Sequence, residues 1–354
     1  MRTHSPKWLY PITAPLAILY GAAINVRNRL YDSGVFSSYP AAVPVVSVGG
    51  LTAGGSSKTP MAIWTIAQLI QLGAKPGLLS RGYGRKSKQP VWVSRGDGSE
   101  ILTVELSGDE PRMIAERFPT TPVYCDSNRV RGANALVEAG CNVIVLDDGF
   151  QHRRIKRNLD WVILDATLPR LAYRYLPLGF LRESFSSISR AHALWLRVEK
   201  AETGNQWQAA IAKLGVTIPI LSFRTRPSEW RIHNRTLPLD ALKSKTALAF
   251  AGIAHPERFR ASVQSLGVKI TAFQSYRDHH FYTHGDLTSL EAQFRSSGAE
   301  YLVTTEKDFV KLPAVFRSLP VAVLRVDVEP IGDISPLLNQ LRLALPEKNG
   351  DITE

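Results

Sequence analysis

The strongest constraint on the fold is a glycine-rich turn that directly follows a β-branched run. The segment VPVVSVGG (residues 43–50) is typical of a buried strand. The overlapping segment GGLTAGGSSKTP (49–60) then places Lys58 and Thr59 at the start of a helical stretch. A strand, a glycine loop and a helix opened by Lys-Thr form the context that a phosphate-binding loop requires. The sequence therefore predicts a nucleotide-binding α/β fold.

Backbone N–H groups of such a loop, and of the helix that follows, bind phosphate oxygens. We predict that Lys58 reaches the β- and γ-phosphates of ATP and that Thr59 ligates Mg²⁺. Thr52 and Ser57 stand where the strict motif has glycine. Serine at position 57 matters if that residue needs positive φ, and hardly otherwise. The alternative is an ordinary glycine-rich turn with a chance Lys-Thr. The loop residues predicted to bind phosphate are Thr52, Gly54, Gly55, Ser56, Ser57, Lys58 and Thr59.

Short apolar runs alternate with helical stretches through the first half of the chain. Strands are predicted at 75–80, 90–94, 121–125, 142–146 and 159–165, and helices at 58–72, 109–118 and 127–139. This alternation is typical of a parallel sheet with covering helices.

A second set of α/β elements follows a polar, turn-like segment at 222–232. Strands are predicted at 245–252, 268–273, 301–305 and 322–328, and helices from Pro256, near 286–297 and at 334–345. The 322–328 strand is a candidate to pair with 222–232. We expect four regions: an N-terminal membrane-interface segment (1–30), a phosphate-loop domain (31–225), a second α/β domain with linker strands (226–330), and a C-terminal helix and tail (331–354).

Composition narrows the functional class. The two cysteines, Cys125 and Cys141, are too few for a disulfide scaffold and are expected to be reduced thiols. The formal charge of +12 favours an anionic partner: nucleic acid, a membrane surface or a phosphorylated substrate. No RNP-like strand, zinc-finger spacing or helix-turn-helix pattern is present, so we predict no nucleic-acid partner.

The segment WLYPITAPLAILYGAAI (8–24) carries no charged residue and is flanked by basic residues on both sides. It is short for a membrane span, and Pro11 and Pro15 interrupt it. Its aromatic residues and flanking arginines suit an interfacial segment on an anionic membrane surface. A helix buried against the core, or a cleaved signal peptide, are the alternatives. We favour the membrane surface.

Paired acids follow a strongly apolar run in NVIVLDDGFQH (142–152). An apolar strand that ends in Asp147 and Asp148 is typical of a Walker-B carboxylate, because ligands of open parallel sheets lie at those strand ends. One aspartate would hold Mg²⁺, and the other would pair with it or with a base. Paired acids before a glycine also mark ordinary turns, which is the alternative interpretation.

Three arginines follow predicted strand ends: Arg81 and Arg85 in SRGYGRK, and Arg129 in SNRVRG. Guanidinium groups match phosphate bidentately, so these residues are candidates to bind it. A solvated charged surface explains them equally well.

Two further segments carry acid–base candidates. In SGDEPRM (107–113), Asp109 or Glu110 could act on a substrate hydroxyl, although a helix cap and first-turn acid explain the same letters. In RDHHFYTH (277–284), Asp278 with His279 or His280 offers a carboxylate-oriented imidazole, the usual form of a general base. A capping aspartate with surface histidines is the alternative. The segment TTEKDFVKL places Lys307 and Asp308 at the end of a predicted strand.

The order of a TxGGxxKTP loop, RGYGR, GDEP, DDGFQH, PLGFLRE, DHH and TEKD resembles the tetraacyldisaccharide 4'-kinase family of lipid A biosynthesis, from about residue 10 to residue 312. The resemblance implies Mg²⁺- and ATP-dependent phosphorylation of the 4'-hydroxyl of a tetraacylated glucosamine disaccharide 1-phosphate. It places the enzyme at the cytoplasmic face of the inner membrane, as a peripheral or monotopic protein. The implied fold is a P-loop-containing three-layer α/β/α domain with a mostly parallel sheet, plus a second smaller α/β/α domain joined by a two-stranded linker.

The resemblance also assigns roles to individual residues. It implies Lys58, Asp109, Asp278 and His279 as catalytic residues, with His279 rather than His280 assisting Asp109. It implies that Arg81, Arg129, Arg182 and Lys307 bind ATP together with the loop, and that Thr59, Asp147, Asp148 and Glu183 surround the metal. The family's loop usually ends GGTGKT, whereas this chain has GGSSKT. Because the other motifs are intact, we expect a working site.

The alternative function is a membrane-associated regulatory P-loop ATPase. Its deviant loop normally has a second lysine early in the motif, where this chain has Ala53. That difference favours the kinase.

Overall fold

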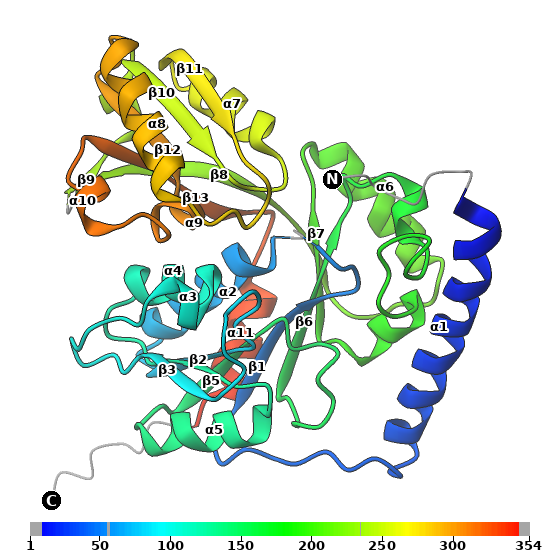
Figure 1. Ribbon diagram of the computed structural model, residues 1–354. Coiled ribbons are helices and arrows are strands. Elements are labelled where there is room, and N and C mark those ends of the chain that lie inside the picture. Colours follow the sequence, from blue (N-terminus) through cyan, green and yellow to red (C-terminus); the bar gives the residue numbers. More distant parts are fainter. Residues whose placement is uncertain (1–8, 55–56, 234, 347–354) are drawn as a thin grey trace, which may run out of the picture.

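The computed structural model describes residues 9–54, 57–233 and 235–346, and it is built on one twisted sheet flanked by helices (Figure 1). Within those residues the sheet has 13 strands in the order β11-β10-β12-β13-β8-β7-β6-β1-β5-β2-β4-β3, with β9 paired to β8. The strands are β1 (Val45–Gly50), β2 (Pro76–Ser80), β3 (Val91–Ser94), β4 (Val123–Cys125), β5 (Val143–Asp147), β6 (Leu159–Asp165), β7 (Ala193–Arg197), β8 (Ile220–Ile232), β9 (Arg235–Leu237), β10 (Thr246–Ala251), β11 (Lys269–Ser275), β12 (Tyr301–Thr305) and β13 (Val321–Ile331).

Neighbouring strands are parallel except at three places, where β8 pairs with β13, β3 with β4 and β9 with β8. The longer helices are α1 (Tyr10–Asp32), α2 (Lys58–Gln71), α4 (Asp109–Arg117), α5 (Arg129–Glu138), α6 (Ala201–Ala212), α7 (Pro256–Ser265), α8 (His284–Ser296) and α11 (Ser335–Ala344). Three single-turn helices are α3 (Val104–Ser107), α9 (Glu306–Phe309) and α10 (Ala314–Arg317). The mostly parallel α/β fold predicted from the sequence is confirmed.

Alternate residues of the central strands enter different cores, as the two-residue period of a strand requires. Val46 of β1 and Val145 of β5 pack in one core with α2, α4 and α11. Val45 and Leu146, their neighbours along the same strands, pack on the opposite face with α5. Both faces of these strands are therefore buried, which explains why the sequence shows continuous apolar runs there.

The smaller unit, formed by β9–β13 and α7–α10, is also three-layered. Phe259 and Val263 of α7 pack against one face of its strands. Leu290 of α8 and Phe309 of α9 pack against the other face. The predicted second α/β/α domain is confirmed.

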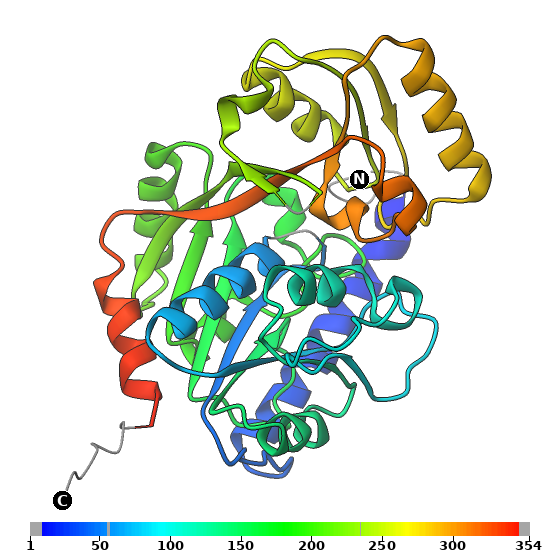
Figure 2. The same cartoon turned by 90° about the vertical axis from the view of Figure 1, so that its left-hand side faces the viewer.

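The long strands β8 and β13 connect the two units. They pair antiparallel from Ala322 with Ile232 to Ile331 with Ser222, as the sequence predicted for these segments. Figure 2 shows β13 (orange-red) crossing from the smaller unit to the left-hand side of the view, where the chain turns down into α11 (red). Leu337 and Leu341 of α11 then enter the same core as α2, so the C-terminal helix packs with the phosphate-loop half of the molecule. The division at residues 30, 225 and 330 stays a proposal.

Helix α1 lies along one side of the molecule (Figure 1). Its buried positions Thr13, Ala17 and Gly21 are small and recur every four residues. Gly21 lies so close to the Tyr175 ring that an added Cβ would be 2.6 Å from it. Large apolar side chains of α1 remain exposed: Ile12, Leu16, Ile18, Leu19 and Val26. Across the residues that the structure describes, we find no helix with the length and apolarity that a membrane crossing requires.

Candidate functional site

The glycine loop links the C-terminal end of β1 to the first turn of α2, as predicted. Gly54 has φ +94, a left-handed conformation that suits glycine. Gly55 and Ser56, which we predicted to bind phosphate, lie outside the described residues. Thr52 is buried and bridges to Leu181, and the N–H of Ala53 donates to the carbonyl of Phe180 at 2.8 Å. The loop is therefore braced by the segment that contains PLGFLRE.

Ser57 adopts the conformation for which the motif normally has glycine. Its φ of 61 and ψ of 26 lie in the left-handed region, immediately before Lys58 opens α2. A residue with a Cβ pays roughly 1–2 kcal/mol for this conformation. The sequence predicted that serine at position 57 matters only if this residue has positive φ. It does, so serine strains the loop.

Lys58 lies between the loop and the acidic pair. Its Nζ donates to the carbonyl of Gly54 at 3.0 Å and lies 3.9 Å from Asp148 Oδ1. Burial lowers the pKa of Lys58, while the charge of Asp148 opposes that shift. Thr59, the next residue, is buried in the first turn of α2. Both side chains are thus at the end of the sheet where the parallel strands β1 and β5 finish.

Asp147 ends β5 as a buried carboxyl group beside other acids. Ser80 Oγ, at the end of the neighbouring β2, donates to Asp147 Oδ2 at 3.2 Å. Burial, with the charges of Glu110 and Asp148, raises the pKa of Asp147 to about 7. A buried carboxyl with two acidic neighbours is stabilised in its charged form by a cation, so these residues fit a Mg²⁺ site.

Asp148 has the opposite electrostatic environment. Arg182 binds it bidentately, with Nη1 and Nη2 at 2.8 and 2.7 Å from its two carboxylate oxygens. Burial would raise the pKa of Asp148, but Lys58 and Arg182 outweigh it and lower the pKa to about 2. The two aspartates of the predicted Walker-B pair therefore differ in protonation: Asp148 is ionised at neutral pH, whereas the pKa of Asp147 lies close to neutral pH.

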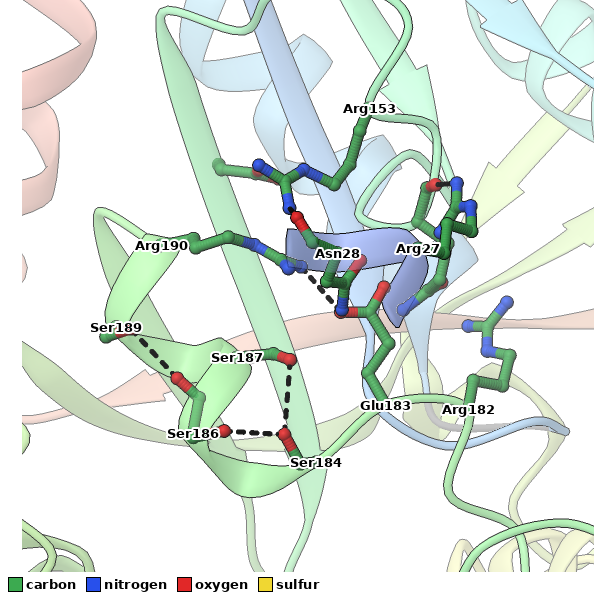
Figure 3. Close-up of polar contacts among 12 residues, drawn as sticks. Arg27, Asn28, Arg153, Arg182, Glu183, Ser184, Ser186, Ser187, Ser189 and Arg190 are labelled. Atoms are coloured by element: carbon green, nitrogen blue, oxygen red, sulfur yellow. Dashed lines mark hydrogen bonds and ion pairs between the residues drawn. The ribbon is translucent and has the colours of Figure 1, made fainter. Parts of the chain in front are cut away.

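Glu183 lies in a polar network between α1 and the 3₁₀ turn η3 (Phe185–Arg190) (Figure 3). It is fully buried, and its Oε2 accepts hydrogen bonds from Asn28 Nδ2 at 3.0 Å and from Arg190 Nη2 at 2.6 Å. Its Oε1 has no partner among the described residues. Glu183 thus ties α1 to the segment that carries Arg182. Its place beside the metal stays a prediction.

Among the described residues, no group of three or more His, Cys, Asp and Glu side chains is arranged to hold a metal. Mg²⁺ in phosphoryl-transfer sites keeps several waters and takes one or two carboxylates together with substrate phosphates. Thr59, Asp147 and Asp148 match that smaller set.

Arg129 is buried at the start of α5, close to the acidic pair. Its Nη1 donates to the carbonyl of Asp126 at 2.6 Å, and its Nε has no partner among the described residues. Burial lowers the pKa of Arg129 to about 10. Arg81, by contrast, is exposed. Of these two predicted phosphate-binding arginines, Arg129 is therefore held in the interior, whereas Arg81 lies at the surface.

An open cavity of about 240 Å³ adjoins Arg129. The residues that line it are Ser127, Asn128, Arg129, His152 and Arg154. Burial and the charge of Arg129 lower the pKa of His152 to about 4, so this imidazole is neutral at physiological pH. His152 was not singled out in the sequence, although it is the last letter of the DDGFQH motif.

The two units meet at Asp109 and His279. Asp109 is the buried first residue of α4, and His279 follows β11 in the smaller unit. Asp109 Oδ2 and His279 Nδ1 are 2.8 Å apart. This hydrogen bond raises the pKa of His279. Burial would raise the pKa of Asp109, but His279 and two neighbouring lysines lower it overall. The structure thus brings together two residues that the sequence separates widely.

Lys307 fixes the orientation of the His279 ring. Its Nζ is 3.1 Å from His279 Nε2, 3.3 Å from Asp278 Oδ1 and 3.7 Å from Asp109 Oδ2. An ammonium group only donates, so Nε2 is the acceptor and the proton of a neutral imidazole sits on Nδ1, facing Asp109. The neighbouring carboxylates raise the pKa of Lys307 against the effect of its burial. All four predicted residues of this region are therefore in contact.

Glu110 joins this pair to the phosphate loop. Burial raises its pKa, and the charges of Lys307, Asp109 and Lys58 all act on it. It also raises the pKa of Asp147. The sequence offered Glu110 beside Asp109 as an acid of the GDEP segment, and its charge interacts with residues of both the Asp109–His279 pair and the acidic pair.

Unusual backbone conformations concentrate here. The described residues include five non-glycine residues with positive φ, and Ser57, Asp148 and His279 are three of them. Such strained residues persist when the surrounding structure fixes them, and they are frequent at functional sites.

Ion pairs hold α4 against the smaller unit at a second place. Arg117 pairs with Glu306 at 3.2 Å and also contacts Asp327. Arg317 Nη1 binds Glu116 Oε1 at 3.1 Å. The Asp109–His279 contact is therefore one end of a longer interface along α4.

Comparisons with known proteins point to one family. A family model described as tetraacyldisaccharide-1-P 4'-kinase matches residues 9–344. Proteins named tetraacyldisaccharide 4'-kinase from Syntrophus aciditrophicus (strain SB) and Bdellovibrio bacteriovorus are 38% and 37% identical to this chain. The alignments cover 88% and 85% of this chain and 87% and 89% of theirs. A crystal structure described as the "apo" form of LpxK from Aquifex aeolicus in complex with ATP has a TM-score of 0.79 at 31% identity, covering 94% of this chain and 98% of that one.

Proposed function

Because the chain belongs to the tetraacyldisaccharide 4'-kinase family, we propose that it transfers the γ-phosphoryl group of ATP to the 4'-hydroxyl of tetraacyldisaccharide 1-phosphate, a lipid A precursor, to give lipid IVA. The single observation that carries the proposal is the Asp109–His279 contact, which presents a buried carboxylate base oriented by an imidazole of the smaller unit. Phosphoryl transfer needs mainly positioning and charge neutralisation, and both are available here.

In this proposal the loop and Lys58 hold the phosphates of ATP, with Arg182, Arg81, Arg129 and Lys307 as further cationic groups. Thr59, Asp147 and Asp148 would hold Mg²⁺, which neutralises phosphate charge when bound. The pKa of Asp147 near 7 supports this assignment, because a cation there would keep its carboxylate ionised.

Asp109 acts as the general base, assisted by His279. As the hydroxyl oxygen of the acceptor bonds to the γ-phosphorus, its proton moves to Asp109 and the bond from phosphorus to the β–γ bridging oxygen breaks to release ADP. Asp278 and Lys307 hold the imidazole from its Nε2 side. Contact between the two units across this pair would exclude water and limit ATP hydrolysis.

The test is transfer of radiolabelled phosphate from ATP to the purified disaccharide 1-phosphate in detergent micelles with Mg²⁺. Labelled product supports the kinase. ATP hydrolysis without labelled product, stimulated by lipid, would instead support the regulatory ATPase.

We also propose that α1 rests on an anionic membrane surface, at the cytoplasmic face of the inner membrane, where a lipid substrate is reached. The exposed Leu16 and Leu19 of α1, 49% and 66% exposed, would enter the interface, and basic residues such as Arg29 would contact headgroups. The absence of a nucleic-acid partner stays a prediction.

Changing both leucines to glutamate (L16E/L19E) is expected to reduce binding to vesicles of anionic phospholipid by about tenfold or more, because two apolar side chains no longer enter the interface. Co-sedimentation with the vesicles measures it. The matched control is Leu343→Glu on α11, which changes a leucine that is 87% exposed on a different helix. Equal losses in both proteins would contradict a specific role of α1.

Ser57→Gly is expected to raise the free energy of unfolding by about 1 kcal/mol, because glycine takes the left-handed conformation without the strain that serine carries. Ser57→Ala retains the Cβ and is expected to leave stability unchanged. Thermal unfolding measures both. If alanine stabilised the protein as much as glycine, the hydroxyl group, not the backbone, would be responsible.

A further inference from the structure

Lys311 is a buried cation that none of the motifs explains. Its side chain is 1% exposed, and it follows α9 in the smaller unit. Its Nζ lies 3.1 Å from Asp308 Oδ1 and 3.8 Å from Asp109 Oδ2. Both carboxylates are themselves buried. A buried ammonium group is stable only when it is paired with opposite charge. The two carboxylates that pair with Lys311, Asp308 and Asp109, therefore indicate which side chains it positions.

Asp308 connects this lysine to the backbone of His279. Its Oδ2 accepts hydrogen bonds from the N–H of Gly252 at 3.0 Å and from Thr305 Oγ1 at 2.8 Å. The carbonyl of Gly252 in turn accepts from the N–H of His279 at 3.2 Å. An added Cβ at Gly252 would lie 3.0 Å from Asp308 Oδ1, so the chain passes very close to this carboxylate. One glycine thus separates Asp308 from the residue that carries the imidazole.

Two of these groups, the His279 imidazole and the Lys311 ammonium, approach the same atom, Asp109 Oδ2. The imidazole of His279 reaches Asp109 Oδ2, and Lys311 approaches the same oxygen from the Asp308 side. His279 has φ +60, a conformation that its surroundings must maintain. The other oxygen, Asp109 Oδ1, accepts one hydrogen bond, from the N–H of Glu110 at 3.0 Å, and keeps further acceptor capacity.

We propose that Lys311 and Asp308 are positioning residues for the phosphoryl transfer proposed above, and the inference rests on that function. Together they hold the His279 imidazole and Asp109 Oδ2 in place. Asp109 Oδ1 is then the oxygen that receives the proton of the acceptor hydroxyl. The smaller unit contributes to the reaction by fixing the orientation of a base that the larger unit carries.

Four titratable groups face Asp109, and a test must separate them. His279, Lys307 and Lys311 come from the smaller unit, and Glu110 comes from α4 itself. Removing the cation of Lys311 raises the pKa of Asp109, because a nearby positive charge no longer favours the carboxylate. The acid limb of the rate profile then moves to higher pH.

The experiment compares Lys311→Met, Asp308→Asn and the double variant in the full chain, by kcat, by KM for ATP, by the pH profile of kcat and by Tm. In Lys311→Met we expect kcat to fall about tenfold or more with KM for ATP unchanged, and the acid limb to rise by about half a pH unit. The double variant leaves no unpaired buried charge, so it should regain the wild-type Tm while kcat stays low. The control Lys245→Met removes an exposed ion pair of the same unit, 2.7 Å from Glu300, and should change nothing.

Recovery of wild-type kcat in the double variant would overturn the positioning role and leave Lys311 as a structural residue. An unmoved acid limb in Lys311→Met would overturn it too. Absence of transfer by the wild-type protein would instead overturn the proposed function. NMR titration of the His279 ring needs no turnover, and an unchanged titration in Lys311→Met would contradict the positioning role independently.

Discussion

Lys58→Ala is expected to reduce phosphoryl transfer by about a thousandfold, because the γ-phosphate loses the cation that stabilises charge in the transition state. The same change should weaken ATP binding, since the Lys58 ammonium already lies at the loop and 3.9 Å from Asp148. Radiolabel transfer and binding of a fluorescent ATP analogue measure the two effects. Lys213→Ala, which removes an exposed lysine at the end of α6, is the matched control and should behave as wild type. A Lys58→Ala protein that kept a tenth of its activity would show that the loop does not bind ATP as proposed.

Asp109→Asn is expected to lower kcat by about a thousandfold while ATP affinity stays at the wild-type value. Asparagine keeps the shape of the side chain and can still bind His279, but it cannot take the proton of the acceptor hydroxyl. Single-turnover transfer, with ATP binding measured in parallel, separates the two effects. Asp240→Asn replaces an exposed aspartate and serves as the control. Equal loss of turnover and of ATP binding would remove Asp109 from its role as base.

The pH dependence of the rate gives the same assignment a second test. The pKa of Asp109 lies below its ordinary value of 3.8, so the basic form is already present at neutral pH and is lost as the pH falls. In His279→Ala the aspartate loses the hydrogen bond that lowers its pKa. The acid limb of the rate profile should therefore move to higher pH. An unchanged acid limb would show that His279 does not act on Asp109.

Local sequence patterns predicted most of the sheet because the central strands are buried on both faces. Val143–Asp147 and Leu159–Asp165 are short runs rich in apolar and β-branched residues, and their length favours strands over helices. Helix α6 was not predicted, and its glycine explains why. Gly204 interrupts the helical pattern, yet an added Cβ there would lie 2.5 Å from Ser222 Oγ, so this glycine lets the helix approach β8 closely.

The candidate site could be predicted as residue types but not as an arrangement. The glycine loop and the paired aspartates are local motifs, whereas the contact of Asp109 with His279 joins residues 170 positions apart. No local pattern distinguished His279 from His280; the resemblance chose His279, and the structure pairs His280 with Asp286 instead, at 3.0 Å. Lys311 lies in the quoted segment TTEKDFVKL, but nothing there distinguishes it, since its importance comes from burial between two carboxylates. The left-handed backbone at Ser57 is likewise a property of the folded loop.

The place of α11 in the structure has a consequence for how the protein is made. Leu337 and Leu341 complete the core beneath α2, but the ribosome adds them after the whole smaller unit has been synthesised. A nascent chain that already contains the glycine loop, Asp147 and Asp148 still lacks this helix. The apolar surface under α2 is then exposed and can be bound by chaperones and proteases. We therefore expect a release-blocked or truncated chain to be degraded instead of persisting as a fragment that consumes ATP.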